Sequence, residues 1–451
     1  MSPHFDHRTA ALGEVPDLAG PRGALRTHLE RDVLAWWSRH GADDELGGVR
    51  TCFTNRGEPL SAEKYTWSQG RWAWTCALIA EEIRAGRLQG DHDLWHRRAL
   101  ATAGFLTAHA FLPDGRTAFR LSARGGALAD TQGQLATSVF ADLFAVLGLA
   151  GALRLTDSAA ESSSSREPSR PDTAAASASD PARWLAQAER TLRGAADSLH
   201  HRTARSEPYP VSAGFRDLAG PMTLLHVAAE LHRATGSVLA ADVMTEARAV
   251  LLGGESAFLG PETWWEHRPD DPADHDTLLA RHVTPGHLLE LLWMLVHVGD
   301  LHPQLAVPDG TLTVLALRAL ETGWDQAEGG LLRYVDRDTG AAPTGRELGT
   351  PYEALVHRTW DTKLWWVHAE SLYATDLLAR RTGSSGLARW AERVREYTLA
   401  TFPDPDGQEW IQIRSRDGSP LDEVVALPVK DPMHIARSLL LLNALEAGEE
   451  G

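Results

Sequence analysis

The stretch SVFADLFAVLGLAGALRL, residues 138–155, decides the fold class of this chain. Its large apolar side chains recur every three or four residues, which is the spacing of one face of an α-helix. Segments with similar periodicity recur along the sequence, at residues 22–40, 67–86, 92–111, 181–201, 221–236, 241–253, 284–298, 311–323, 361–382, 386–402 and 432–447. With 138–155 they predict twelve helices and an all-α protein.

The connections between these helices alternate in character. Several are long and rich in Gly, Pro, Trp and charge, such as residues 253–283 and 324–360, and WIQIRS at 410–415 has strand potential. Long ordered loops in a helical protein usually build a functional site. We therefore expect one closed α/α barrel over residues 1–451, whose inner helices present their ends to a single cleft. A helical solenoid is the alternative, although no strong fixed-period repeat is visible.

Residues 157–180, DSAAESSSSREPSRPDTAAASASD, have low complexity and lack bulky apolar side chains. Such a composition cannot bury enough apolar surface to offset the entropy of folding. We expect a disordered insertion between two helices of the same domain rather than a domain boundary.

Charge and composition exclude several classes of function. The formal net charge is −17, which argues against nucleic acid and against an anionic membrane surface as partners. No basic and apolar leader is visible, and no apolar run is expected to span a membrane, which takes about 20 residues. The two cysteines form no metal-binding or disulfide pattern. We expect a cytoplasmic protein, whose 16 tryptophans suit either a core or the walls of a carbohydrate cleft.

Two helix starts share one local pattern, T-P-G-H at 284–287 and D-P-M-H at 431–434. Thr and Asp are good N-caps and Pro suits the first helical position, which places His287 and His434 at the third. Unpaired amides and the helix dipole disfavour a positive imidazole there, so we expect two neutral histidines able to accept a proton from carbon. Glu290 lies one turn after the first of them. The alternative is that each histidine is only a capping or satisfied polar residue.

Six segments in chain order resemble segments of the N-acylglucosamine 2-epimerase family, whose relatives include cellobiose 2-epimerase, mannose isomerase and sulfoquinovose isomerase. They are WSQGRWAW (67–74), SVFADLFAVLGL (138–149), PMTLLHVAAEL (221–231), PGHLLELLW (285–293), KLWWVHAESLYA (363–374) and VKDPMHIARSLL (429–440). The resemblance covers nearly the whole chain. It implies an α/α barrel of six inner and six outer helices, and a homodimer.

The resemblance also implies roles for individual residues. His287 and His434 become the acid/base pair, and the implied substrate-binding residues are Arg71, His226, Glu290, Trp365, Trp366, Glu370 and Arg437. Adjacent helical residues point to different sides, so we expect one of the two tryptophans to meet substrate while the other packs. Arg71 has the alternative of a core ion pair, and His226 that of a satisfied core histidine. Arg333 and Tyr334 are weaker candidates for a cleft loop.

These residue types suit proton transfer at C2 of an open-chain aldose. The adjacent carbonyl acidifies the C2 proton, and a base of near-neutral pKa removes it to leave an enediolate. A fixed cation such as Arg71 stabilises the developing charge. A second acid returns the proton to the opposite face of C2, giving the epimer, or to C1, giving the ketose. Neither route needs a metal or a nicotinamide, so we predict no metal and no cofactor, and a small sugar as the partner.

The sequence leaves the sugar open, and two other classes of function remain. The segment before His434 lacks the Trp and Cys of the N-acylglucosamine branch, so N-acetylglucosamine/N-acetylmannosamine epimerisation and mannose/fructose isomerisation are both hypotheses. An inverting glycoside hydrolase needs two carboxylates about 6.5–9.5 Å apart. Asp130, Glu266 and Glu370 are available but form no recognisable pair. The third class is a non-catalytic sugar- or protein-binding relative.

Overall fold

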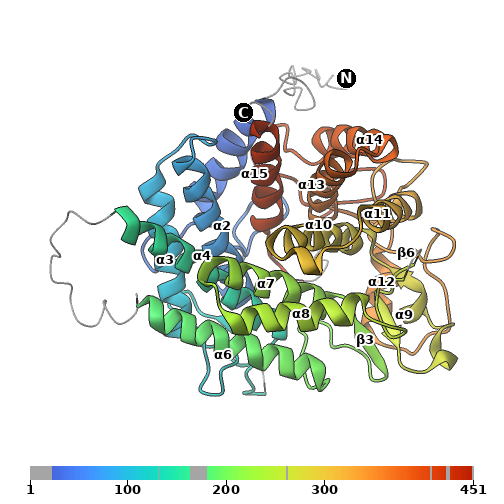
Figure 1. Cartoon of the computed structure of the whole chain (residues 1–451), viewed down its shortest axis with the longest axis horizontal. Coiled ribbons are helices and arrows are strands. Elements are labelled where there is room, and N and C mark those ends of the chain that lie inside the picture. The colour runs from blue at the N-terminus through green and yellow to red at the C-terminus, as the bar shows by residue number, and fades with distance from the viewer. Residues whose placement is uncertain are drawn as a thin grey trace, which may run out of the picture.

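The computed structural model describes residues 23–130, 132–162, 180–260, 263–406, 409–422 and 427–448, and leaves out the side chains of 157–162. Within these ranges all twelve predicted helices are present (Figure 1). The first is a continuous run of helical turns, α1 (Ala24–His28), η1 (Leu29–Leu34) and η2 (Trp37–Gly41). The others are α2 (Thr66–Arg84), α3 (His92–His109), α4 (Val139–Ser162), α6 (Pro181–His200), α7 (Ala219–Thr235), α8 (Val238–Leu252), α10 (Pro285–Leu301), α11 (Asp309–Gly323), α13 (Trp365–Thr382), α14 (Ser385–Thr401) and α15 (Met433–Ala447).

Six of these helices form a closed ring. Helices α2, α4, α7, α10, α13 and α15 each pack against the next, and α15 returns to α2. Figure 1 shows this closure, since the red α15 lies between the blue N-terminal helices and the orange α13. Helices α3, α6, α8, α11 and α14 pack outside the ring, and η1 packs on α15. The predicted α/α barrel is confirmed, and the largest hydrophobic cluster of buried residues extends from Leu25 to Leu442.

Four short antiparallel strand pairs connect the long loops at one end of the barrel. They are β1 (Lys64–Tyr65) with β2 (Arg120–Leu121), β3 (Phe215–Asp217) with β4 (His267–Pro269), β5 (His282–Val283) with β6 (Val335–Asp336), and β7 (Lys363–Leu364) with β8 (Ile413–Arg414). The first strand of each pair leads within two residues into an inner helix. The long loops are thereby fixed at the N-terminal ends of the inner helices. Of the predicted strand at 410–415, only 413–414 pair.

The structure adds and corrects some local elements. The short helices η3 (Pro272–Asp274), α9 (Leu278–Arg281), η4 (Pro303–Leu305) and α12 (Pro351–Thr359) are too short for a periodic pattern to reveal. The expectation of a disordered 157–180 is wrong at both ends. The backbone of α4 continues to Ser162, and Asp180 caps α6 by accepting a hydrogen bond from the Ala182 amide. Residues 163–179 lie outside the described residues.

Helix α4 also corrects the expectation about apolar runs. Residues Val139–Thr156 have a mean hydropathy of 1.7, which is sufficient for a membrane span by length and composition. This window is 83% buried inside the protein. A helix that is apolar on all sides is expected in the centre of a large core as well as in a membrane. As an inner helix, α4 is covered by α2, α3, α6 and α7.

Glycines allow α2 and α4 to approach closely. A Cβ added at Gly70 of α2 would collide with the backbone carbonyl of Phe144 in α4. On the opposing side, a Cβ at Gly148 would lie 2.8 Å from the Gly70 Cα, and one at Gly151 would lie 2.8 Å from the Trp74 Cα. Backbone atoms cannot move aside cheaply, so these three positions require glycine. This contact holds Arg71, the next residue in α2, in a fixed place relative to α4.

We expect Gly70→Ala to lower the free energy of unfolding by at least about 2 kcal/mol, because overpacking here forces two helices apart. Chemical denaturation measures the effect. Gly194→Ala in the outer helix α6 is the matched control, since a Cβ there meets nothing within 4 Å. It should leave stability unchanged or raise it by up to about 1 kcal/mol, the usual gain of alanine over glycine in a helix. Equal effects at both positions would contradict this account of the α2–α4 contact.

Candidate active site

A cavity of about 300 Å³ opens at the end of the barrel where the inner helices begin. Every inner helix lines it through residues of its first turns. They are Arg71 of α2, Phe140 and Phe144 of α4, Met222 and His226 of α7, His287 and Glu290 of α10, Trp365 and Trp366 of α13, and His434 and Arg437 of α15. All the residues predicted to bind substrate or act on it therefore meet in one place, except Glu370, which lies directly behind His434.

His287 is oriented by a buried carboxylate. It occupies the third position of α10, as predicted, and its Nδ1 lies 2.7 Å from Glu266 Oε1. Burial disfavours the charged imidazole, but the charge of Glu266 and its hydrogen bond outweigh burial and raise the pKa of His287 above its ordinary value. This shift is opposite in direction to the one expected from the helix start. The helix dipole is a weaker influence than a carboxylate in direct contact.

His434 has a similar arrangement on the other side of the cavity. Helix α15 begins at Met433, so the histidine is its second rather than its third residue. Asp431 still caps the helix, because its Oδ1 accepts a hydrogen bond of 2.9 Å from the Met433 amide. The imidazole Nδ1 lies 2.7 Å from Glu370 Oε1. With Nδ1 held by a carboxylate, Nε2 is the nitrogen left to face the cavity.

One tryptophan ring contacts both imidazoles. The Trp366 ring centroid lies 4.9 Å from that of His287 and 6.0 Å from that of His434. Trp365 lines the same cavity but is also buried in the core, so the expectation that one tryptophan meets substrate while the other packs stays a prediction. Both residues belong to the first turn of α13, whose end faces the cavity, and there two adjacent side chains reach the same space. Arg333 and Tyr334 also line the cavity, as the sequence suggested.

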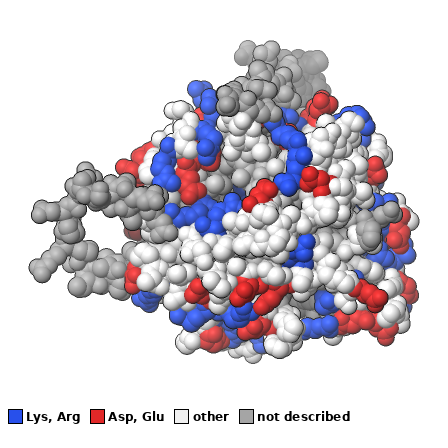
Figure 2. All heavy atoms as spheres, viewed as in Figure 1, with Lys and Arg blue, Asp and Glu red and all other residues white. Residues whose placement is uncertain are grey.

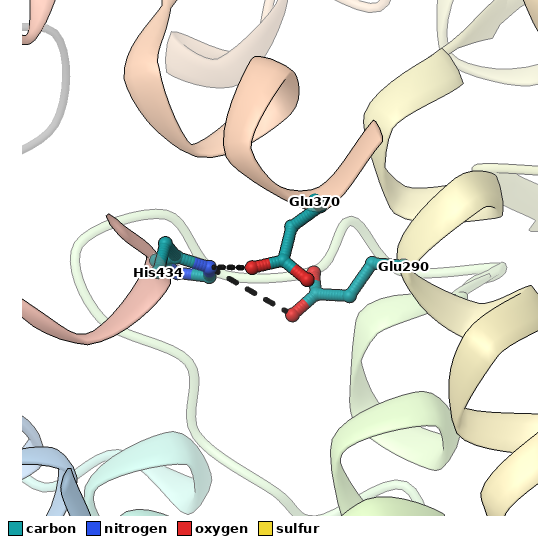
Figure 3. A group of neighbouring side chains, drawn as sticks. All are labelled: Glu290, Glu370 and His434. Atoms are coloured by element: carbon teal, nitrogen blue, oxygen red, sulfur yellow. Dashed lines mark hydrogen bonds and ion pairs between the residues drawn. The ribbon is translucent and has the colours of Figure 1, made fainter. Parts of the chain in front are cut away.

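Arg437 bridges the two carboxylates that lie behind His434. Figure 3 shows Glu290 and Glu370 turned toward the imidazole, and ligand atoms of these three residues lie within 4.8 Å of one another. Arg437 Nη2 donates to Glu370 Oε1 at 2.5 Å and to Glu290 Oε1 at 2.9 Å. Glu370 Oε2 accepts from the Trp293 indole at 2.8 Å. A guanidinium already supplies the positive charge these carboxylates need, so the group does not favour a metal ion. Glu290, implied to bind substrate, lines the cavity and also accepts a hydrogen bond from Arg437.

Arg71 is both a cavity residue and a member of an ion pair. Its Nη1 lies 2.6 Å from Asp431 Oδ2, and its guanidinium lies 4.0 Å from the centroid of the Phe144 ring and 5.4 Å from that of Trp67. Arg71 therefore lines the cavity and also takes part in an ion pair, so both roles that the sequence left open are present. The carboxylate partner is itself part of the cavity wall.

His226 is buried in the barrel but lines the bottom of the cavity. It packs edge-on against Trp293 at 5.4 Å and Trp74 at 6.1 Å between centroids. Burial lowers the pKa of His226 to about 3, so the ring is neutral at physiological pH. Its Nε2 is buried and has no hydrogen-bond partner among the described residues. A neutral imidazole with an unused nitrogen suits a hydroxyl group of a ligand.

Sequence reasoning missed the acidic side of the site. The sequence offers Glu266 as a weak candidate for the cleft and as an acid of a hydrolase, and gives no reason to single out Asp217, yet both line the cavity near His287. The β3–β4 pair brings them together, since the Leu218 amide donates to the Glu266 carbonyl at 2.9 Å. Burial, and then the charge of Glu266, raise the pKa of Asp217 to about 6. No local motif reveals either residue.

The carboxylates are not arranged for glycoside hydrolysis. Asp130 is exposed and lies outside the cavity lining. Glu266 and Glu370 are each bonded to a histidine Nδ1 at 2.7 Å, so the imidazoles stand between these acids and a ligand. A hydrolase needs its acids free to reach the glycosidic oxygen and a water. At these two positions the site therefore presents an imidazole, rather than the acid bonded to it, to a bound molecule.

Comparisons with known proteins agree with one another. Residues 174–436 match the family model described as N-acylglucosamine 2-epimerase (GlcNAc 2-epimerase). N-acylglucosamine 2-epimerase of Bos taurus is 26% identical over 418 residues, which cover 92% of this chain and 88% of that protein. The solved structure of cellobiose 2-epimerase from Bacillus thermoamylovorans has a TM-score of 0.68 at 15% identity, covering 93% and 98% of the two chains. That of a D-mannose isomerase has a TM-score of 0.68 at 16% identity, covering 97% and 100%.

We expect Glu266→Gln to lower the pKa of His287, because the amide keeps a hydrogen bond but removes the charge that stabilises the imidazolium. NMR titration of the imidazole nitrogens measures the shift, and the midpoint for His287 should move to lower pH. Glu347→Gln is the matched control, since Glu347 pairs with the exposed His357 at 3.0 Å. That change should leave the titration of His287 where it is. An unchanged midpoint in Glu266→Gln would show that Glu266 does not set the protonation of His287.

Proposed function

The chain belongs to the N-acylglucosamine 2-epimerase family, and we propose that it is a sugar epimerase or isomerase in which His287 and His434 move the C2 proton of an open-chain aldose. The observation that carries this proposal is the pair of imidazoles that contact one Trp366 ring. Each has its Nδ1 fixed by a buried carboxylate, which leaves Nε2 to the cavity. Two such groups can act on the two faces of a sugar carbon.

The two histidines are suited to opposite roles. Glu266 raises the pKa of His287, which favours the imidazolium and hence a proton donor. At His434 the charge of Glu370 is shared with Arg437, and we assign this imidazole the role of proton acceptor. In one direction His434 removes the C2 proton, and the electron pair of that bond moves toward the carbonyl to give an enediolate. In the reverse direction the roles exchange.

The second proton transfer decides the product. Return of a proton from His287 to the opposite face of C2 restores the carbonyl at C1 and gives the 2-epimer. Delivery to C1, with transfer of the O2 proton to O1, gives the ketose. The negative charge that develops on oxygen is proposed to lie near the N-terminal ends of the inner helices and near Arg71, where amides and a guanidinium shared with Asp431 favour it. His226 and Glu290 are proposed to hold the sugar with Trp365 and Trp366.

The family members named above act on different sugars, and both reactions remain hypotheses for this chain. We propose N-acetylmannosamine and mannose as first substrates to test. The shared step is proton abstraction at C2, and it can be detected before the product is known.

We expect His287→Ala and His434→Ala each to lower turnover by at least about 100-fold, because each removes one of two proton-transfer groups. Exchange of the C2 proton for deuterium in deuterated water, followed by NMR, measures the step. Circular dichroism and thermal unfolding should remain close to wild type. His357→Ala, at an exposed histidine of α12, is the control and should be fully active. Wild-type exchange in either cavity variant would remove that histidine from the mechanism.

We expect the wild-type protein to convert at least one of N-acetylmannosamine, mannose, glucose and cellobiose in the same NMR experiment. A 2-epimer identifies an epimerase, whereas fructose formed from mannose identifies an isomerase. Release of free glucose from cellobiose would instead indicate hydrolysis. If no sugar gives an epimer, a ketose, free glucose or exchange at C2, a binding protein would be favoured instead.

A further inference from the structure

The guanidinium groups of the described cavity wall are already engaged by protein groups. Arg71 pairs with Asp431 at 2.6 Å, and Arg437 pairs with Glu370 and Glu290 at 2.5 and 2.9 Å. The third, Arg333, is buried, lies 4.8 Å from the centroid of the Tyr334 ring and donates to Thr359 Oγ1 at 3.1 Å. A negatively charged ligand gains most from a cation that has no other partner. The cavity offers it paired cations instead.

Carboxylates outnumber guanidinium groups in this wall. The described acidic residues that line the cavity are Glu207, Asp217, Glu266, Glu290 and Asp431. Like charges brought together in a partly buried site repel strongly, because the surrounding protein screens them less than water does. A phosphate, sulfonate or carboxylate on the ligand would face this repulsion. The hydroxyl groups of an uncharged sugar would instead find carboxylate oxygens as hydrogen-bond acceptors.

We infer that this site selects uncharged sugars and rejects phosphorylated, sulfonated and uronic acid sugars, and that Asp431 is the residue that enforces the selection. This inference rests on the proposed function, because it names the substrate class of the same cavity. Asp431 stands out among the carboxylates because it neutralises the one guanidinium, that of Arg71, which lies beside the cavity-facing nitrogen of His434.

Three contacts hold the carboxylate of Asp431 in this position, and two more hold its backbone. Oδ1 caps α15 through the Met433 amide at 2.9 Å. Oδ2 lies 2.6 Å from Arg71 Nη1 and 3.5 Å from His434 Nε2. The backbone is held on both sides by one amide side chain, since the Asp431 N–H donates to Gln412 Oε1 at 3.0 Å and its carbonyl accepts from Gln412 Nε2 at 3.1 Å. The carboxylate therefore cannot turn away to release Arg71 to an anion.

Asparagine is the informative replacement at this position. Its carbonyl oxygen can still cap α15, because Asn is as good an N-cap as Asp. Its amide carries no charge, so Arg71 would face the cavity without a counterion. Asp431→Asn should therefore convert the site from one that rejects anions to one that binds them. Asp431→Ser, which also keeps a capping oxygen, is a second variant in case the first does not fold.

The first test uses the wild-type protein. We expect conversion of mannose or N-acetylmannosamine, and no detectable conversion or binding of mannose 6-phosphate or glucuronate. Thermal unfolding in rising inorganic phosphate, compared with chloride at equal ionic strength, should show no stabilisation by phosphate. Turnover or binding of mannose 6-phosphate as good as that of mannose would overturn the inference. If no sugar is converted, the proposed function fails, but the phosphate measurement still reports on the charge of the cavity.

The second test compares variants. We expect Asp431→Asn to bind inorganic phosphate at least 10-fold more tightly than wild type, and the Arg71→Gln/Asp431→Asn double variant to lose that gain. Asp242→Asn, at an exposed site on the outer helix α8, removes the same charge without uncovering Arg71 and should behave as wild type. No gain in phosphate binding by folded Asp431→Asn or Asp431→Ser would overturn the role given to Asp431. A gain that survives loss of Arg71 would overturn it as well.

Discussion

Two buried carboxylates, Glu266 and Glu370, are the constraint on which the rest of the site depends. A charge removed from water must be paired, and each of these carboxylates is paired with the Nδ1 of a histidine at 2.7 Å. Glu370 has further donors in Arg437 and the Trp293 indole, whereas Glu266 Oε2 has no partner among the described residues. His287 is therefore the main hydrogen-bonding partner of Glu266, and the charge of Glu266 raises the pKa of that imidazole. This difference makes two similar histidines unequal, which is what a reaction with separate acid and base steps requires.

The helices and most cavity residues could be predicted from sequence because both depend on local patterns. Apolar periodicity marked the twelve helices, and the repeated Pro-x-His start marked His287 and His434. The partners of these residues could not be predicted, since they lie far away in the chain. Arg71 and Asp431 are 360 residues apart, and Glu266 reaches His287 only through the β3–β4 pair. The raised pKa of His287 could not be predicted for the same reason, because its cause is a tertiary contact and not the helix to which it belongs.

The direction of the inner helices explains how one small cavity accommodates so many carboxylates. All six begin at the cavity, so their positive dipole ends and free amides converge there. The carboxylate of Asp431 accepts a hydrogen bond from one such amide, that of Met433 in the first turn of α15. Asp217 does so at α7, where Oδ2 accepts from the Gly220 amide at 3.2 Å. The outer surface is different, since Figure 2 shows acidic and basic side chains interspersed over the visible face.

The closure of the ring by α15 has a consequence for how the chain reaches its native state. This helix is the last in the sequence, yet it packs between α13 and α2 and carries both His434 and Arg437. Contacts between the two ends of a chain form late, because they require the largest loss of chain entropy. During synthesis the apolar α4 and its neighbours leave the ribosome before the segment that completes their enclosure. The closed core and the reactive centre therefore depend on the same helix, and a chain without α15 is expected to lack both.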